Sequence, residues 1–266
     1  MNTSTLIRRM RYRLRTAISH VPAVYLPLAD LRQRDADGAT VVTPATDIVV
    51  EAFPRCGNTF TVAALRLSEQ RRLDIAHHTH SAAQLIRGVR MGRPSLLIVR
   101  QPKDSVLSFV MRHSELSIEL GLWSWIRFHT KLLPYLDGMV VATFEQVTSD
   151  LGPVIDTINA RYGIALPRFD HTQENVDACF KAIEARYRKR FGDGDVDESG
   201  VARPSSERAE RKREMQGAWD APSLSAQRAV AAALYDRIRA MAAGGIDPAH
   251  MRRAAAHEGT PAGIRP

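Results

Sequence analysis

The chain has few cysteines and no long apolar run. Its 266 residues include only Cys56 and Cys179, and two cysteines cannot form the disulfide framework of a small secreted protein. No run of apolar residues approaches the length that a membrane-spanning helix needs. The N-terminal segment lacks the continuous apolar stretch and the small-residue cleavage site of a signal peptide. We therefore expect a cytoplasmic protein.

Two nucleotide-binding motifs are also missing. The Walker A pattern G-x-x-x-x-G-K-[ST] does not occur, which argues against a P-loop triphosphatase and against a nucleotide kinase. The pattern G-x-G-x-x-G is absent as well, which weakens a dinucleotide-binding interpretation.

The composition is that of a globular protein with a surplus of positive charge. The hydrophobic fraction is 44% and the charged fraction 25%, which are ordinary values. The 37 basic residues exceed the 29 acidic ones by eight, so the net charge is +8. This charge indicates an anionic partner, but it does not choose between nucleic acid, a membrane surface and a small phosphorylated ligand.

Strand-like and helix-like segments alternate in the first two thirds of the chain. Runs rich in β-branched residues that end at turns predict strands over 47–53, 95–100 and 138–144. Helical periodicity predicts helices over 57–72, from Pro102 onward, over 120–136 and over 150–164. The alternation predicts an α/β fold, a three-layer sandwich in which helices cover both faces of a central, mainly parallel sheet.

We expect one domain over residues 1–266, with its core at about 45–170. Predicted strands stop after residue 170, so residues 171–245 are expected to form a helical extension. Within that extension, the Gly-, Asp- and Ser-rich loop 192–206 could work as a lid.

Residues 1–35 are predicted to form a basic N-terminal arm. Five arginines lie between Arg8 and Arg15, and they could touch anionic lipid or nucleic acid. A solvated basic helix or a frayed arm explains the same residues.

The first candidate site is the turn FPRCGNTF, residues 53–60. If a strand ends at Phe53 and a helix begins near Gly57, the first amides of that helix lack acceptors within it, and the helix dipole attracts an anion to them. Gly57 lets the backbone approach a ligand closely, Thr59 adds a hydroxyl and Arg55 adds a permanent charge. An ordinary strand-to-helix turn with a surface arginine explains the same stretch.

The second candidate is VRQPKDSVLSF, residues 99–109. Arg100 closes a predicted strand, and Pro102 suits the first turn of a helix. Ser108 then lies nearly two turns into that helix. Arg100 could reach an anion beside the sheet edge, although the residues that follow it are also ordinary helix-start residues.

Together the two stretches resemble the donor-binding motifs of the sulfotransferases. FPRCGNTF is similar to the family's 5′-phosphosulfate loop, roughly [FY]-P-[KR]-S-G-[NT]-T-[WF], and VRQPKDSVLSF resembles its 3′-phosphate motif, R-x-P-K-D-x-x-x-S. The later VVATFEQVTSDLGPVIDTINARYGI looks like the family's segment of strand, [YF]-E-D-L and helix. The resemblance covers roughly residues 47–165. It implies a fold related to the P-loop nucleotide kinases, with 3′-phosphoadenosine 5′-phosphosulfate (PAPS) as co-substrate and no metal.

The resemblance also implies roles for the residues of the first loop. Arg55 would act on the bridging oxygen and the sulfuryl group. Gly57, Asn58 and Thr59 would bind the 5′-phosphate, and Phe60 would pack on the adenine.

The second motif would hold the part of the donor that distinguishes it from ATP. Arg100 and Ser108 would bind the 3′-phosphate. Cys56 departs from the family's serine in the first loop. If that position contributes mainly its amide, cysteine is tolerable there; if the hydroxyl matters, the affinity for the donor falls.

Three histidines, His77, His78 and His80, lie between the two motifs. Histidine suits proton removal near neutral pH. Because the family often carries K-T-H in this interval, the resemblance implies that His80 is the catalytic base. His78 then replaces the lysine, whose role Arg55 would carry alone. An exposed loop is the plain alternative, and a metal cluster would lack a fourth ligand.

A weaker resemblance to the family occurs in ARPSSERAERKREMQGAW, at about residues 203–219. In the family, a basic segment before a tryptophan closes over the 3′-phosphate. This resemblance makes Arg211 and Lys212 ligands, with Arg208 as a competitor. A salt-bridged exposed helix explains the same stretch.

The sequence therefore predicts a PAPS-dependent sulfotransferase, in the cytoplasm or peripheral to a membrane. Its acceptor would be a hydroxyl or an amine of a small molecule, a glycan or a lipid, because acceptor pockets are built by variable loops. One alternative is a non-catalytic nucleotide-binding or regulatory protein that keeps the donor site. Another is a nucleic-acid-binding protein, which only the charge supports, and we expect no nucleic-acid partner.

Overall fold

A computed structural model describes residues 3–33, 40–68, 72–191 and 206–242. Within them, four parallel strands form a sheet in the order β2-β1-β3-β4. The strands are β1 (Ile48–Ala52), β2 (Ile75–His77), β3 (Ser95–Val99) and β4 (Val140–Thr143).

Helices occupy most of the remaining described residues. In the N-terminal half they are α1 (Thr3–Ile18), α2 (Pro22–Gln33), α3 (Asn58–Ser68), α4 (Ala82–Arg90), α5 (Pro102–Arg112) and α6 (Ile118–Leu132). In the C-terminal half they are η1 (Leu133–Gly138), α7 (Phe144–Ser149), α8 (Gly152–Tyr162), α9 (Gln173–Phe191), α10 (Ser206–Glu214), α11 (Gln216–Trp219), η2 (Pro222–Leu224) and α12 (Ser225–Arg239).

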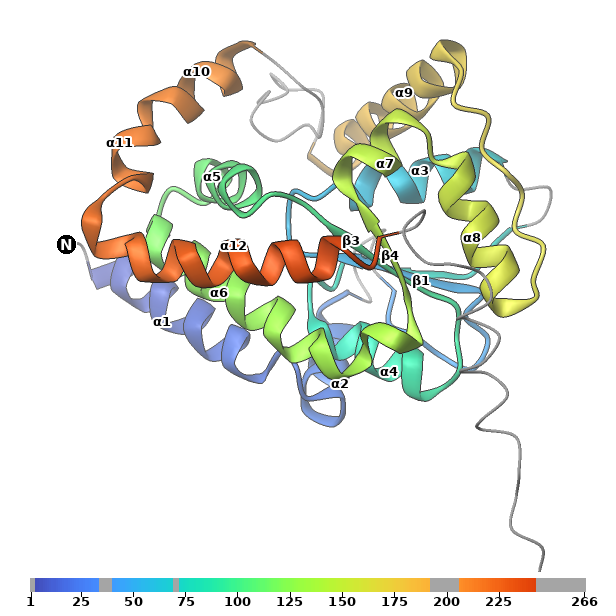
Figure 1. The fold of residues 1–266 in the computed structure, drawn as a ribbon, viewed down its shortest axis with the longest axis horizontal. Helices are drawn as coiled ribbons and strands as arrows, with labels where there is room; N and C mark the ends of the chain where they lie inside the picture. The colour runs from blue at the N-terminus through green and yellow to red at the C-terminus, as the bar shows by residue number, and fades with distance from the viewer. Residues whose placement is uncertain (1–2, 34–39, 69–71, 192–205, 243–266) are drawn as a thin grey trace, which may run out of the picture.

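The sheet is the middle of three layers (Figure 1). On one face α3 packs on β1 and β2, with α9 outside it; on the other, α4 packs on β1 and β3, with α2 and α6 outside it. From β1 the chain passes through α3 to β2 on one side of β1. It then passes through α4 to β3 on the other side of β1. Because such crossovers are right-handed, this reversal puts α3 and α4 on opposite faces. The predicted α/β fold with a helix-covered parallel sheet is confirmed.

The register of the two central strands brings their following loops together. Every residue of β1 and β3 is buried, as expected for strands covered on both faces. Ala52 at the end of β1 pairs with Ile98 near the end of β3. The loops after the two strands therefore leave the same edge of the sheet side by side.

Elements that were not predicted from the sequence include β2, α2, α4 and α7. β2 has only three residues, too few for strand periodicity to appear. α2 begins at Pro22 and contains Pro27, a residue type that usually ends a helix. Its side chains Tyr25 and Leu26 are nonetheless buried in the core.

The N-terminal arm is a helix fixed to the body of the protein and is not frayed over its described residues. Tyr12 of α1 donates a hydrogen bond from its hydroxyl to Ser124 Oγ of α6, at 2.8 Å. The Arg127 guanidinium donates to the carbonyl oxygens of Thr16 and Ala17, at 3.2 and 2.8 Å. A cation at the last carbonyls of a helix stabilises that end.

The C-terminal helix also belongs to the packed body. α12 packs against α6, α5 and β4. Beyond it, Ala242 forms an isolated parallel bridge with Val141 of the edge strand β4. Most of the loop expected to act as a lid, residues 192–205, lies outside the described residues.

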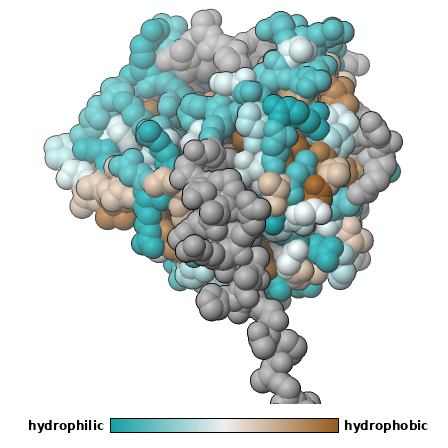
Figure 2. Space-filling model, turned by 45° about the vertical axis from the view of Figure 1, so that its right-hand side comes forward, coloured by the Kyte–Doolittle hydropathy of each residue, from teal (hydrophilic) through white to brown (hydrophobic). Residues whose placement is uncertain are grey.

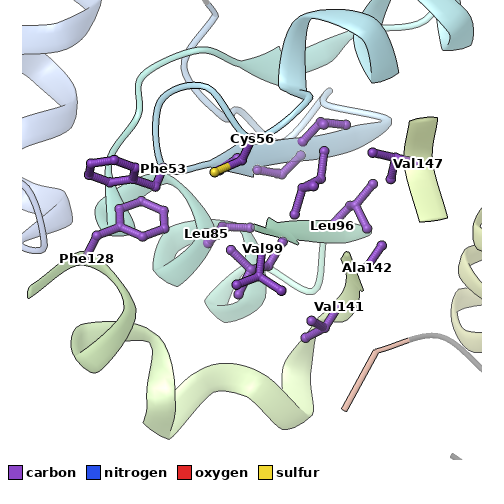
Figure 3. Packing of buried hydrophobic residues seen from close by; sticks show 14 of the residues in the cluster. Phe53, Cys56, Leu85, Leu96, Val99, Phe128, Val141, Ala142 and Val147 are labelled. Carbon is purple, nitrogen blue, oxygen red and sulfur yellow. The ribbon is translucent and has the colours of Figure 1, made fainter. Parts of the chain in front are cut away.

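The core lies between the sheet and its helices. Figure 3 shows Phe53 and Phe128 side by side at one end of this core, with residues of β3 and β4 farther along it. On the face in Figure 2, hydrophilic residues predominate and hydrophobic ones appear in smaller groups. Among the helices that the structure describes, none combines the length and apolarity needed to cross a bilayer.

Candidate functional site

The candidate site lies at the carboxyl ends of β1 and β3. In open parallel sheets, ligands bind outside the carboxyl ends of the strands, where the strand order reverses. Here the reversal falls between β1 and β3, because β1 connects to β2 on one side and β3 lies on the other. The loop after β1 leads into α3, and the loop after β3 leads into α5.

The loop after β1 is a tight turn that presents backbone amides. The first intrahelical bond of α3 runs from the Thr61 amide to the Gly57 carbonyl, at 3.0 Å. The amides just before Thr61 have no acceptor within the helix, and the dipole of α3 makes the spot before them attractive to an anion.

Gly57 is required by this geometry. Its φ is +91°, in the region that favours glycine. A Cβ there would lie 3.2 Å from Val147 Cγ2 and 3.3 Å from Phe144 Cδ2. Any other residue would therefore be strained and crowded.

Asn58, the first residue of α3, carries an unusual buried amide. Its side chain is only 3% exposed. Within the described part of the chain, neither Oδ1 nor Nδ2 has a hydrogen-bond partner. A buried polar group without a partner costs about 1–3 kcal/mol. Because both atoms are closed to solvent, an oxygen bound in this loop could accept from Nδ2 only after a shift of the loop or of the side chain.

Arg55, Arg100 and Ser108 converge beside this loop. Arg55 Nε donates to Ser108 Oγ at 3.1 Å, although these residues are far apart in the sequence. Arg100 Nη1 donates to the Arg55 carbonyl at 2.9 Å, and its guanidinium lies 3.9 Å from the centroid of the Phe144 ring. The structure thus brings Arg55 of the first motif together with Arg100 and Ser108 of the second.

The Cys56 side chain lies in the core. It is fully buried among core side chains that include Phe53 (Figure 3), and burial raises the pKa of its thiol to about 12. Its Sγ lies 3.8 Å from the Pro54 carbonyl oxygen of the turn, so the thiol packs beneath the loop and is closed to solvent.

His80 is held as a neutral imidazole with one nitrogen available. Its Nδ1 lies 3.0 Å from the Ala52 carbonyl oxygen, which only accepts, so we assign the proton to Nδ1 and the lone pair to Nε2. Burial lowers the pKa of His80 to about 4, although a quarter of the side chain is exposed. Its φ of 47° is left-handed.

Glu51 holds the His80 segment in place, and the sequence interpretation missed it. Its Oε1 accepts from the Thr79 amide at 2.6 Å and from the Thr79 hydroxyl at 2.8 Å. Its Oε2 accepts from the amides of His80, at 3.1 Å, and Ala52, at 3.3 Å. The sequence does contain a signal for it, because Glu51 interrupts a strand rich in β-branched residues. A carboxyl group at such a buried position needs hydrogen-bond partners.

Glu51→Gln should lower the free energy of unfolding by about 1–3 kcal/mol. If Oε1 keeps both bonds from Thr79, the new amide nitrogen meets the N–H groups of Ala52 and His80 and cannot accept from them. Urea unfolding at pH 5 measures the loss. Glu119→Gln, at an exposed site on α6, is the matched control, with an expected change within about 0.5 kcal/mol. An equal effect of both variants would contradict the assignment.

The same variant tests the protonation of Glu51. Burial raises the pKa of this carboxyl from 4.5 to about 8, so the folded state binds its proton more tightly than the unfolded state. The resulting stability is complete below pH 4.5 and is lost as the pH rises through about 8. The difference between wild type and Glu51→Gln should therefore be smaller at pH 8.5 than at pH 5.

His77 and His78 connect Arg66 to Thr59. Arg66 Nη2 lies 3.0 Å from His77 Nε2, the two Nδ1 atoms of His77 and His78 are 2.6 Å apart, and His78 Nε2 lies 3.0 Å from Thr59 Oγ1. An arginine can only donate, so His77 Nε2 accepts and its Nδ1 carries the proton. His78 then accepts at Nδ1 and donates from Nε2 to Thr59. The Thr59 hydroxyl proton is left to point elsewhere.

Burial supports this assignment of protons. It lowers the pKa of His77 to about 3 and the pKa of His78 well below its ordinary value, so both rings are neutral near pH 7. His77 belongs to β2 and is fully buried. The alternative of an exposed loop therefore fails for His77, whereas His78 and His80 lie in the loop after β2 and are partly buried. Among the described residues, no group of three or more His, Cys, Asp or Glu side chains is placed to hold a metal ion.

The remaining predicted ligands lie apart from the cluster or have other partners. Lys212 of α10 forms an ion pair with Asp104 of α5, at 2.9 Å. Asp104 lies one helical turn before Ser108 on α5. Arg211 is exposed, and the side chain of Arg208 lies outside the described residues.

Phe60 is enclosed by other aromatic rings. The ring centroids of Phe169, His171 and Phe180 lie 6.1, 5.7 and 5.8 Å from its own. A purine could reach this ring only if α9 or the segment before it moved.

Comparisons with known proteins find little. No protein-family model matches the chain, and no curated protein matches it. Among solved structures, the chain is similar to mouse sulfotransferase SULT7A1 complexed with PAP, at 12% identity and a TM-score of 0.39, over 75% of this chain and 92% of that one. A likeness at this level does not show a family, so any function has to come from the site residues.

Proposed function

We propose that the protein is a sulfotransferase that moves a sulfuryl group from PAPS to a hydroxyl or amine acceptor. The observation that supports this most is the contact of Arg55 with Ser108 and of Arg100 with the Arg55 backbone. Two arginines from separate loops and a hydroxyl from α5 meet beside the amides of a helix N-terminus. Such a group suits a ligand with two separate phosphates.

In this proposal the first turn of α3 binds the 5′-phosphosulfate. The amides of Asn58 and Thr59 and the amide of the Asn58 side chain donate to its oxygens. The Thr59 hydroxyl donates as well, because His78 donates to its oxygen and turns its proton away. His78 thus stands where the family's lysine would be, and it would act through Thr59.

Arg100 and Ser108 bind the 3′-phosphate in this proposal. Both are engaged with Arg55 in the structure, so donor binding would exchange protein contacts for charge-assisted bonds to phosphate. Lys212 is held near the same face of α5 by Asp104 and could add a further contact.

The transfer itself would be an in-line displacement at sulfur. The acceptor oxygen or nitrogen forms a bond to sulfur, while the bond from sulfur to the 5′-phosphate oxygen breaks. His80 takes the acceptor proton on Nε2. The leaving 3′,5′-adenosine bisphosphate carries the new negative charge, which Arg55 and the loop amides stabilise.

Isothermal titration calorimetry with 3′,5′-adenosine bisphosphate tests the donor site. We expect binding, and binding at least about tenfold weaker for 5′-AMP, because one charge-assisted bond contributes about 1.5–3 kcal/mol. Ser108→Ala should weaken bisphosphate binding and leave 5′-AMP binding unchanged. No binding to a folded sample at high ligand concentration would contradict the proposal.

A second function is favoured by the residue at position 78. His78 is neutral and directed to Thr59, so it supplies no cation to the leaving group. The absence of a cation at position 78 is consistent with a protein that binds the donor nucleotide without transferring a sulfuryl group. Bisphosphate binding without transfer to any acceptor in a broad panel would favour it.

A further inference from the structure

The helix α1 exposes an apolar face to solvent. Leu6, Met10 and Leu14 are 44, 61 and 66% exposed, and their spacing of four residues places them along one side of the helix. Ile7, on the same side, is 50% exposed. A surface helix usually turns such a stripe toward the core.

The opposite side of α1 faces the protein. Thr16 is buried, and Tyr12 bonds to Ser124 of α6. Arg9, also on this side, donates from Nε to the carbonyl of Glu115, at 2.6 Å. The helix therefore docks through polar contacts and presents its aliphatic side chains outward.

α2 continues the exposed apolar surface. It buries Tyr25, Leu26 and Ala29 and exposes side chains on its other side. Of the ten large apolar side chains that are exposed among the described residues, eight lie on α1, on α2 and in the turn between them. They form what we call the α1–α2 apolar surface: Leu6, Ile7, Met10, Leu14, Val21, Val24, Leu28 and Leu31. In Figure 1, α1 runs along the lower left of the molecule and α2 lies at its bottom.

Positive charge borders this surface. Residues 3–18 contain no Asp or Glu. At about 100° per residue, Arg11 and Arg13 flank the Met10–Leu14 stripe on its two sides, and both are exposed, as is Arg8. Arginine stems are long enough to lie along an apolar layer while their charges stay at a polar boundary.

We propose that the α1–α2 apolar surface docks on a membrane that contains anionic lipid. Aliphatic side chains would enter the boundary between headgroups and acyl chains, and Arg11 and Arg13 would meet lipid phosphates, as in helices that lie in the plane of a membrane. The charges favour this partner over a second copy of the chain, since a symmetric pairing of α1 with α1 would bring arginine against arginine. The inference does not depend on the proposed transfer activity.

Flotation of the full chain with lipid vesicles tests the proposal. Vesicles are made of phosphatidylcholine alone or of an equal mixture with phosphatidylglycerol. We expect binding to the anionic vesicles, little binding to the neutral ones, and a decrease as salt is raised. The triple variant Leu6→Gln, Met10→Gln, Leu14→Gln should lower binding at least about tenfold, because the transferred apolar area is lost. Arg11→Gln with Arg13→Gln should lower it about fivefold for each arginine.

Matched controls lie on α12, where Val230, Arg237 and Arg239 are exposed. Val230→Gln, and Arg237→Gln with Arg239→Gln, remove the same kinds of group and should leave vesicle binding unchanged. Circular dichroism shows whether each variant folds. Wild-type protein that stays unbound, or binding that the α1 variants do not change, overturns the proposal. Concentration-dependent dimerisation in the ultracentrifuge that the triple variant abolishes, without vesicle binding, assigns the surface to a second copy.

Discussion

Arg55→Ala should lower kcat/KM for sulfuryl transfer from PAPS by roughly two to three orders of magnitude, the usual cost of one charge-stabilising donor. Arg55 lies before the amides of α3 and donates to Ser108, so its guanidinium borders both halves of the proposed donor site. Charge grows on the leaving oxygen only as the bond to sulfur breaks. The loss should therefore fall mainly on kcat, with a smaller loss of affinity for 3′,5′-adenosine bisphosphate.

Three further variants make the Arg55 result specific. Arg55→Lys keeps the charge without the fork that reaches Ser108, so an intermediate loss is expected. Arg55→Gly also removes the side chain but relaxes the positive φ of 70°, which separates lost charge from backbone strain. Arg237→Ala, exposed on α12, should behave as wild type. If Arg55→Ala keeps activity within about threefold of wild type, the loss is too small for a residue that stabilises the leaving group. That result would contradict the role proposed for Arg55.

His80→Asn should lower kcat by roughly two to four orders of magnitude while bisphosphate affinity is unchanged. Asparagine is the matched substitution because it tolerates the left-handed φ of 47° better than most residues, so the backbone bond to Glu51 is kept. Single-turnover rates with PAPS and calorimetry with the bisphosphate separate the two quantities. An unchanged kcat would remove His80 as the base.

The pH profile gives an independent check on His80. Burial lowers the pKa of its imidazole to about 4, so the neutral base persists below the ordinary value of 6.5. The kcat/KM of wild type should therefore not fall between pH 7 and pH 5.5 wherever the protein stays folded. An acid limb centred near pH 6.5 that vanishes in His80→Asn would show that the base titrates at its ordinary value, contrary to the effect of burial.

The parts of the fold and site that were predictable are those with local signals. The β1 strand, the turn at Gly57 and the helix that starts at Pro102 each follow from residues that are adjacent in sequence. Parallel strands then bring Arg55 and Arg100 to one sheet edge, which the sequence could imply without fixing any contact.

The parts that were missed depend on tertiary contacts. The hydrogen-bonded chain from Arg66 through His77 and His78 to Thr59 joins α3 to β2 and the residue that follows it, and no spacing rule encodes it. Glu51 lies in β1, whose other residues are typical of a buried strand. Its partners Thr79 and His80 come from the segment after β2. The burial of Cys56 depends on packing between the turn and the core, which its own sequence neighbours do not specify.

The cover over β4 has a consequence for biosynthesis. β4 is an edge strand, and an open edge is a template for pairing with another chain. α12 and the bridge from Ala242 to Val141 cover it, and they are the last described segments to leave the ribosome. The nascent chain must therefore carry an unshielded sheet edge from the synthesis of β4 until α12 has emerged, and α12 completes both the core and its protection from aggregation.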